Sequence, residues 1–345
     1  MKKFKRHREY GFFDQDIRLS KLSQLGDPLE NLKKGVDFEI FRVLLEDKLT
    51  RLPKGKGGRP PYDYVLLFKI LILQRYYNLS DDQIEYQIND RMSFMRFLDL
   101  TIADDIPDSK TVWKFREQLI ELGVILDLFA LFNNKLESLG LIAHQGKIVD
   151  ASFVEVPKQR NSPEENDQIK NSQVPDSFTE KPAKLSQKDT DARWTKKDNK
   201  TYFGYKNHIK ADATSKIILK YQVTDASVHD SQALDMLLED RDEGQALYAD
   251  SAYTGENQEK TVKGKKMVNL VCKKAYRNNP LTKLEKLFNR EKSRVRSRVE
   301  HIFGFMEGSM NRMFLQNIGK KRITGIIGLM NLTYNMFRKI QLRPI

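Results

Sequence analysis

The first 140 residues carry hydrophobic side chains at helical spacing. Residues 62–77 are apolar on nearly all sides, which predicts a buried helix. Directly after this segment, Ser80 and Gln83 form a capping-box pattern, which predicts the start of another helix.

Residues 108–123 predict a further helix, with Asp108 or Ser109 as its N-cap and Gly123 as its end. Its apolar positions recur every three or four residues, at Val112, Phe115, Leu119 and Leu122. One more helix is expected to end at Gly140. Short helices with tight turns and basic flanks suit a helix-turn-helix type of DNA reader. An ordinary helical bundle gives the same pattern, and no single helix has an evident base-reading face.

From about residue 141 the apolar pattern changes to that of strands. The region predicts strands first, then alternating helix and strand, then helices, which fits an α/β layer with a mixed sheet. The expected elements are a strand at 146–156, two strands within 201–227 joined by a turn at 212–216, a helix at 230–244, short strands within 246–253 and 266–272, and helices from Leu281 onward. We therefore expect two regions, a helical region at 1–140 with a basic linker near 51–61, for which DNA binding is one interpretation, and an α/β domain at 141–345.

Residues 157–200 interrupt the expected strands with a long polar stretch. The stretch is rich in charge and poor in aliphatic side chains, so it predicts a mobile or inserted loop. A loop of this length in a compact domain is expected to have a function, and a basic segment beside a DNA site would supply one.

The chain is strongly basic. Its 345 residues include 60 Lys and Arg against 47 Asp and Glu, a formal net charge of +13. Such an excess favours a polyanionic partner such as nucleic acid, although a solvated basic surface is the alternative. The basic residues are locally dense, which supports the nucleic-acid interpretation. The runs lie at 1–8, 51–60, 193–200 and 289–298.

The number of cysteines and the spacing of the histidines argue against a disulfide framework and against a zinc site. Cys272 is the single cysteine, so no disulfide can form within the chain. The five histidines show no zinc-type spacing. The longest apolar run, 65–73, contains Lys69 and is too short to span a bilayer. We expect an intracellular protein.

Three acidic residues stand at positions typical of a metal site. Asp150 and Asp250 each follow a short apolar strand and precede a small residue. Glu300 borders an apolar helical stripe, and Arg296 lies four residues earlier on the same side. Carboxylates are the ligands that Mg²⁺ or Mn²⁺ prefers, and two such ions roughly 3.5–4 Å apart support in-line displacement at phosphorus. The pattern favours a site for phosphodiester chemistry.

Each acid also has a structural interpretation. Asp150 would cap a turn, Asp250 would cap the helix that follows, and Glu300 would pair with Arg296. Glu307 shares the helix face of Glu300 and is a rival third carboxylate. The metal-site hypothesis depends on the order of the three acids in a basic chain.

The motifs resemble those of bacterial insertion-sequence transposases of the DDE class, in the insertion-sequence-five group. The matching stretches are IVDAS (148–152), WTKKDNKTYFGYKNHIKAD (194–212), TDASVHDSQAL (224–234), ALYADSAYTG (246–255) and RVEHIFG (298–304). Residues 58–88 are similar to the domain that precedes the catalytic core in that family. The resemblance covers nearly the whole chain.

The resemblance implies a ribonuclease-H-like fold, a mixed sheet flanked by helices. It implies two Mg²⁺ or Mn²⁺ ions, with Asp150, Asp250 and Glu300 as catalytic and metal-binding residues. It also implies double-stranded DNA as partner, at transposon ends and target, a homodimer or higher oligomer, and a bacterial cytoplasm with nucleoid association. The expected DNA contacts are Arg296, Arg294, Arg298, Lys196, Lys197 and Lys206. Ser293 and Glu307 depart from the family, which usually has Tyr and a basic residue there.

Two other functions fit the same residues. A ribonuclease-H-like nuclease would cut DNA without joining strands. A catalytically inactive relative would bind DNA as a regulator, although the intact acidic triad argues against it.

Overall fold

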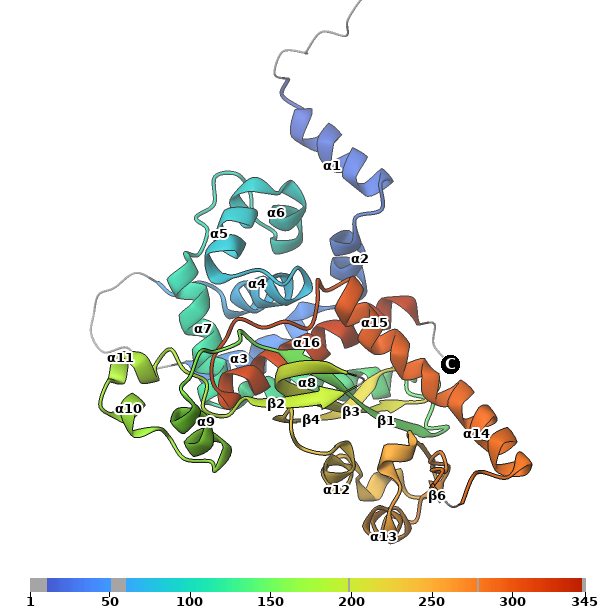
Figure 1. The fold of residues 1–345 in the computed structure, drawn as a ribbon. Coiled ribbons are helices and arrows are strands. Elements are labelled where there is room, and N and C mark those ends of the chain that lie inside the picture. Colours follow the sequence, from blue (N-terminus) through green and yellow to red (C-terminus); the bar gives the residue numbers. More distant parts are fainter. Residues whose placement is uncertain (1–10, 51–59, 198, 278, 343–345) are drawn as a thin grey trace, which may run out of the picture.

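The computed structural model describes residues 11–50, 60–197, 199–277 and 279–342. A six-stranded sheet lies between a thick layer of helices on one face and a thinner cap on the other (Figure 1). The expected basic runs at 1–8 and 51–59 lie outside the described residues. Within the described ranges, no helix is long and apolar enough to cross a membrane.

The N-terminal region is all-helical, as predicted. The helix at 62–77 begins where the Asp63 carboxylate accepts hydrogen bonds from the N–H groups of Val65 and Leu66. The capping box of Ser80 and Gln83 is present. The α-helices are α1 (Asp14–Gln24), α2 (Pro28–Gly35), α3 (Arg42–Leu49), α4 (Tyr64–Tyr76), α5 (Asp81–Asp90), α6 (Met92–Leu98), α7 (Ser109–Glu121) and α8 (Val124–Ser138).

One of the four apolar positions at helical spacing in residues 108–123 is not buried. Leu122 is 56% exposed, because Gly123 adopts a left-handed conformation (φ 69°) and turns the chain directly into α8. Leu122 therefore lies at the corner between α7 and α8 rather than on the buried face. Asp108 is the N-cap of α7, and its carboxylate accepts a hydrogen bond from the N–H of Thr111.

The predicted mixed sheet is confirmed. Its central strand β1 (Lys147–Glu155) is antiparallel to β3 (Lys200–Asp212) and parallel to β5 (Ala246–Tyr248). The short strand β6 (Val268–Asn269) continues the parallel side. On the far edge of β3, β2 (Arg193–Lys197) and β4 (Ile218–Asp225) pair with successive segments of that strand.

The helices from Leu281 onward are also confirmed. They are α14 (Lys283–Arg296), α15 (Glu300–Gly308) and α16 (Lys320–Gln341). Helix α16 packs on α4, α8 and β4, so the helical region and one sheet face share a single hydrophobic core. In that core, the side-chain amide of Asn207 on β3 donates a 2.8 Å hydrogen bond to Oδ1 of Asn331 on α16.

A cap of short elements covers the other sheet face. It consists of η2 (Asp230–Ala233), α12 (Leu234–Leu237), η3 (Asp240–Asp242), η4 (Ser251–Tyr253) and α13 (Glu256–Gly264). The expected continuous helix at 230–244 is wrong, because Leu238 is extended (ψ 147°) and ends α12 after one turn. At the start of this segment His229 is the N-cap of η2, and Asp230 pairs with Lys206.

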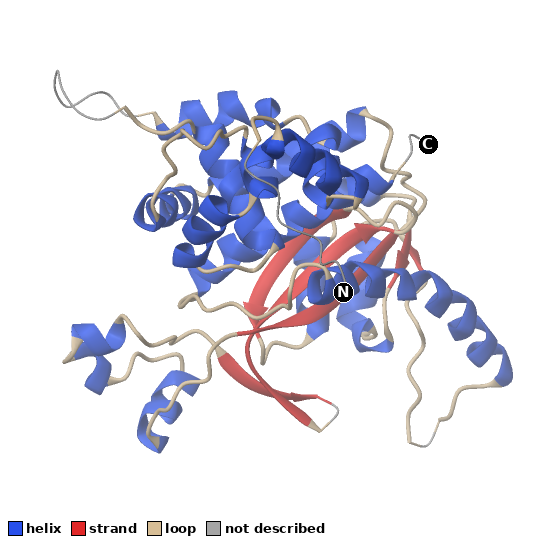
Figure 2. Ribbon diagram, turned by 90° about the horizontal axis from the view of Figure 1, so that it is seen from above, coloured by secondary structure: helices blue, strands red, loops and turns tan. Residues whose placement is uncertain are grey.

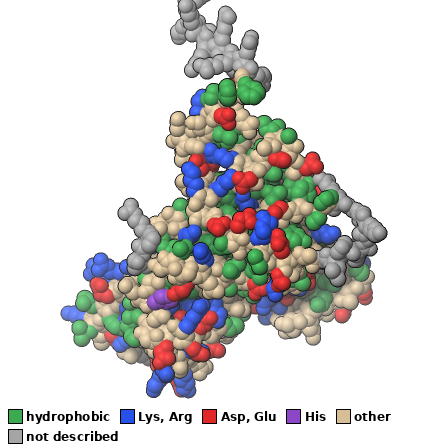
Figure 3. Space-filling model, turned by 180° about the vertical axis from the view of Figure 1, so that it is seen from behind, with side chains coloured by type: hydrophobic (Ala, Val, Ile, Leu, Met, Phe, Trp, Pro, Cys, Tyr) green, Lys and Arg blue, Asp and Glu red, His purple; other side chains and the backbone are tan. Residues whose placement is uncertain are grey.

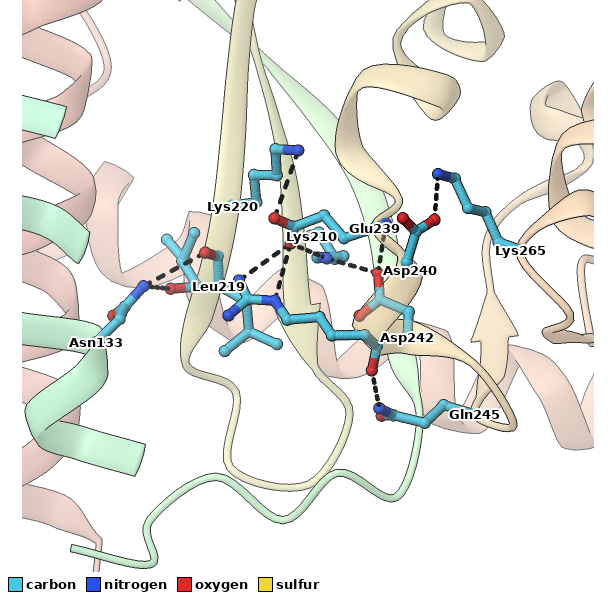
Figure 4. A network of polar contacts seen from close by, with 11 residues as sticks. Asn133, Lys210, Leu219, Lys220, Glu239, Asp240, Asp242, Gln245 and Lys265 are labelled. Atoms are coloured by element: carbon cyan, nitrogen blue, oxygen red, sulfur yellow. Dashed lines mark hydrogen bonds and ion pairs between the residues drawn. The ribbon is translucent and has the colours of Figure 1, made fainter. Parts of the chain in front are cut away.

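A buried ion-pair network fastens this cap to the sheet (Figure 4). Lys210 of β3 has no exposed surface, and its Nζ lies 2.6 Å from carboxylate oxygens of both Glu239 and Asp242. Burial alone would raise the pKa of Glu239, but the hydrogen bond and charge of Lys210 outweigh it and lower the pKa to about 2. The network holds the chain just before β5, and so helps to position Asp250.

Residues 157–200 are not a structureless loop. They form α9 (Pro163–Lys170), α10 (Asp176–Thr179) and α11 (Pro182–Leu185) before β2. Ser162 opens α9 with a capping box, and Phe178 is fully buried beneath the ammonium groups of Lys184 and Lys188. These helices stand away from the main body, and the hairpin of β2 and β3 extends beyond the sheet (Figure 2).

Candidate active site

Asp150 lies in the middle of β1, where its neighbours Ile148 and Val149 are buried in opposite cores. Its Oδ1 accepts a hydrogen bond from the N–H of Ala151 at 2.8 Å, and its Oδ2 lies 3.2 Å from Nη1 of Arg296. Only 17% of the side chain is exposed. Burial raises the pKa of Asp150 to about 6, against the opposing effects of the Ala151 N–H and Arg296.

Asp250 lies beside Asp150 because of the parallel pairing of β1 and β5. Lys147 pairs with Leu247 and Ile148 with Tyr248, and the same register continued by two residues matches Asp150 to Asp250. Asp250 is the N-cap of η4 and accepts a 2.8 Å hydrogen bond from the N–H of Ala252. Its charge also contributes to the raised pKa of Asp150, though less than burial does.

Glu300 is linked to this pair only through Arg296. Glu300 is the first residue of α15 and its side chain is 68% exposed. Nη2 of Arg296 lies 3.7 Å from Oε1 of Glu300, while Nη1 contacts Asp150. The guanidinium therefore lies between the two carboxylates. Within the described ranges, no three His, Cys, Asp or Glu side chains gather closely enough to hold a metal ion.

Glu300 and Glu307 face different cavities. Glu300 lines a cavity of about 570 Å³ together with Lys216, His301 and Arg338. Glu307 lines another, of about 300 Å³, which extends to Ser152 and Glu155 of β1. The sequence predicted that Glu300 and Glu307 share one face of the helix. In the structure, the two side chains line different cavities.

The oxygen donors of this site are those of a hard cation. Asp150 within β1 and Asp250 just after β5 present two neighbouring carboxylates, and no sulfur or imidazole ligand is required. Burial is the main cause of the raised pKa of Asp150, so a bound cation would favour the ionised form of this carboxylate. The donor set therefore fits Mg²⁺ or Mn²⁺.

The lysines expected to contact DNA differ in how far their ammonium groups are exposed to solvent. Lys196 and Lys197 are exposed on the β2–β3 hairpin, and the charge of Lys197 is felt at Asp150. Lys206 is buried, and its Nζ donates to the Val228 carbonyl oxygen at 2.7 Å and to Asp230 at 2.8 Å. Its ammonium group is thus engaged within the protein.

The arginines differ in the same way. Arg294 is exposed on α14, with only a 3.6 Å contact to Glu291. Arg298 donates a 2.7 Å hydrogen bond to the Ala213 carbonyl oxygen. Over the back of the molecule, acidic and basic side chains are intermingled (Figure 3). The basic side chains whose charges act on Asp150 are Arg296 of α14 and Lys197 of the hairpin.

Sequence reasoning did not single out Tyr253, which is packed behind the aspartates. Its hydroxyl has no hydrogen-bond partner among the described residues. Burial, together with the charges of Asp150, Asp230 and Asp250, raises the pKa of Tyr253 well above its ordinary value. Its place three residues after Asp250, in the motif ADSAY, was the available signal.

Three side chains of β2 and β3 make structural contacts. His208 is fully buried, its Nε2 lies 2.8 Å from Oγ1 of Thr224, and burial lowers its pKa to about 4. Tyr202 stacks on Phe153 with ring centroids 4.2 Å apart. Trp194 packs against Phe203 at 4.9 Å. Both aromatic contacts anchor the hairpin.

Two models of known protein families match the chain, one in the helical region and one in the region of the sheet. Residues 143–336 match the transposase DDE domain, and residues 17–118 match a second transposase domain, DUF772. No solved structure matches the chain. The DDE match covers more than half of the sequence and includes β1, β5 and α15. The chain belongs to the family of DDE-domain transposases.

Proposed function

We propose that the protein cleaves DNA at the ends of an insertion sequence of the insertion-sequence-five group and joins the freed 3′-hydroxyl to target DNA. The observation that carries the proposal is the parallel pairing of β1 and β5, which aligns Asp150 with Asp250 in a chain of this family. Two carboxylates held side by side on adjacent strands suit phosphodiester chemistry.

Asp150, Asp250 and Glu300 would hold two Mg²⁺ or Mn²⁺ ions. Such ions, when bound, activate the attacking hydroxyl and stabilise the leaving oxygen at phosphorus. A bound cation would favour the ionised form of the buried Asp150 carboxylate, and the Ala151 and Ala252 N–H groups orient the two aspartates. These hydrogen bonds leave one oxygen of each aspartate free of backbone donors.

Arg296 is proposed to alternate between protein and DNA partners. Its guanidinium bridges Asp150 and Glu300 in the structure. For Glu300 to approach the aspartates, Arg296 has to release Asp150, and a DNA phosphate would offer it an equivalent bidentate partner. Arg296 is then a positioning residue for the third carboxylate.

The proposed DNA path runs along the β2–β3 hairpin and α14. Lys196 and Lys197 are exposed on one side of the site, and Arg294 on the other. Lys206 is left out of this path because its ammonium is paired inside the protein. Joining two element ends to one target would require a dimer or higher oligomer.

The proposal is tested by incubating the protein and Mg²⁺ with the insertion sequence in its flanking genomic DNA. Cleavage and joining products are expected from the wild type and from neither Asp150→Ala nor Asp250→Asn, while DNA binding is retained in both variants. Equal products from the wild type and Asp150→Ala would refute the role of Asp150. Cleavage without joining would instead indicate a nuclease.

A further inference from the structure

A polar cavity lies at the turn between α4 and α5, and none of the proposed catalytic carboxylates lines it. Helix α4 ends at Tyr76, Asn78 takes a left-handed conformation (φ 50°), and Ser80 caps α5. The Asn78 amide donates to the carbonyl oxygens of Asn311 and Phe314, at 3.0 and 3.3 Å. The turn is thereby fastened to the chain segment between α15 and α16.

The cavity, which we call the turn pocket, has a volume of about 240 Å³. That volume accommodates several water molecules, and therefore also a tetrahedral oxyanion. Its lining is mostly polar, with Leu79 and Phe314 as the apolar members. The amides of Gln74 and Asn78 donate within the protein, so the uncharged side chains that remain as donors are Ser80, Gln83, Gln316 and Asn317.

Two buried guanidinium groups face the turn pocket, with one carboxylate between them. Arg116 is 2% exposed and binds both oxygens of Asp81, at 2.5 and 3.0 Å. Arg75 is 7% exposed, and its one hydrogen bond goes from Nη2 to the Leu79 carbonyl oxygen at 3.2 Å. Its Nε has no partner among the described residues, and Arg75 makes no ion pair there. The pocket therefore carries an uncompensated positive charge.

This charge persists at neutral pH. Burial, reinforced by the charge of Arg116, lowers the pKa of Arg75 only to about 10. A buried cation without an ion-pair partner lowers the stability of the fold, unless an anion binds beside it. The N-terminal end of the ten-residue helix α5 also borders the pocket, and its dipole favours negative charge at the same place.

We propose that the turn pocket binds a phosphate group, with the Arg75 guanidinium as its principal contact. A planar guanidinium surrounded by neutral amide and hydroxyl donors is suited to phosphate, which offers several acceptor oxygens. The phosphate comes either from the backbone of bound DNA or from a free phosphate compound. The inference stands independently of the proposed catalytic function, because inorganic phosphate alone can probe it.

The test uses the full-length protein and a variant that supplies the missing negative charge. Asn317 lines the pocket and is half-buried, and no hydrogen bond holds its side chain among the described residues. In Asn317→Asp, an isosteric carboxylate is placed at the pocket. The matched control is Asn134→Asp, which makes the same charge change on the exposed face of α8.

Thermal unfolding and titration calorimetry are measured in phosphate and in chloride at equal ionic strength. Phosphate is expected to raise the melting temperature of the wild type and of Asn134→Asp. Asn317→Asp is expected to melt higher than the wild type in chloride and to bind phosphate at least tenfold more weakly. Binding of phosphate with equal affinity by wild type and Asn317→Asp would overturn the assignment to Arg75.

Duplex DNA binding at several salt concentrations distinguishes the source of the phosphate. If a backbone phosphate occupies the turn pocket, Asn317→Asp reduces the slope of log K against log salt by about one. If the ligand is a free phosphate compound, the slope stays that of Asn134→Asp, while the calorimetric difference remains. No response to phosphate together with an unchanged slope would refute the proposal.

Discussion

Replacing Asp150 by asparagine is expected to stabilise the metal-free protein at neutral pH while abolishing DNA cleavage. The pKa of Asp150 is raised from its ordinary 3.8 to about 6 by burial. That difference of about two pH units, at 1.36 kcal/mol each, means that the ionised carboxylate costs the fold roughly 3 kcal/mol. Asparagine is neutral at every pH, so the variant avoids this cost.

The direction of the pKa shift determines how the stability of the protein depends on pH. Because the folded pKa is raised, the cost is absent below pH 3.8, grows between pH 3.8 and 6, and is complete above pH 6. Asparagine also deprives Arg296 of a charged partner, which reduces the gain. We expect Asp150→Asn to be about 2 kcal/mol more stable than the wild type at pH 8, and nearly equal to it at pH 4.

Urea unfolding in the presence of EDTA measures this difference. Asp167→Asn is the control, because Asp167 is exposed on α9 and its carboxylate is free of hydrogen bonds to described residues. The control is expected to stay within about 0.5 kcal/mol of the wild type at both pH values. The reasoning is refuted if Asp150→Asn is less stable than the wild type at pH 8, or if its advantage is the same at pH 4.

Two further substitutions test the packing that positions the site. Lys210→Met leaves the buried carboxylate of Asp242 without its cation, while Glu239 keeps Arg241 as a partner, so we expect a loss of about 3–5 kcal/mol in urea unfolding. A triple variant that also carries Glu239→Gln and Asp242→Asn should recover most of it; no recovery would contradict the charge argument. Gly328→Ala places a Cβ 2.3 Å from the Tyr221 hydroxyl, so a loss of about 1–3 kcal/mol is expected, and an unchanged melting temperature would show that α16 shifts freely.

Local patterns in the sequence predicted most elements of the fold. Helix α4, the capping box of Ser80 and the turn between β3 and β4 follow from spacing and from the chemistry of single residues. The cap was predicted less well, because its short elements are held by distant partners such as Lys210. The order within 157–200 depends in the same way on burial of Phe178, which composition does not reveal.

The candidate site was predictable where strand register determines it. Asp150 and Asp250 each follow an apolar strand, and parallel pairing then sets them side by side. The position of Arg296 between Asp150 and Glu300 depends on the angle at which α14 and α15 approach β1, which no local pattern encodes. For the same reason the sequence did not indicate that Lys206 is paired with Asp230.

Strand transfer from a pre-cleaved element end tests the central claim most directly. The wild type, incubated with Mg²⁺, such an end and supercoiled target DNA, is expected to give covalently joined products. Asp250→Asn is expected to bind the same end and to give none. Joined products from Asp250→Asn at the wild-type level, with DNA binding unchanged, would contradict the assignment of Asp150 and Asp250 as the centre of the reaction.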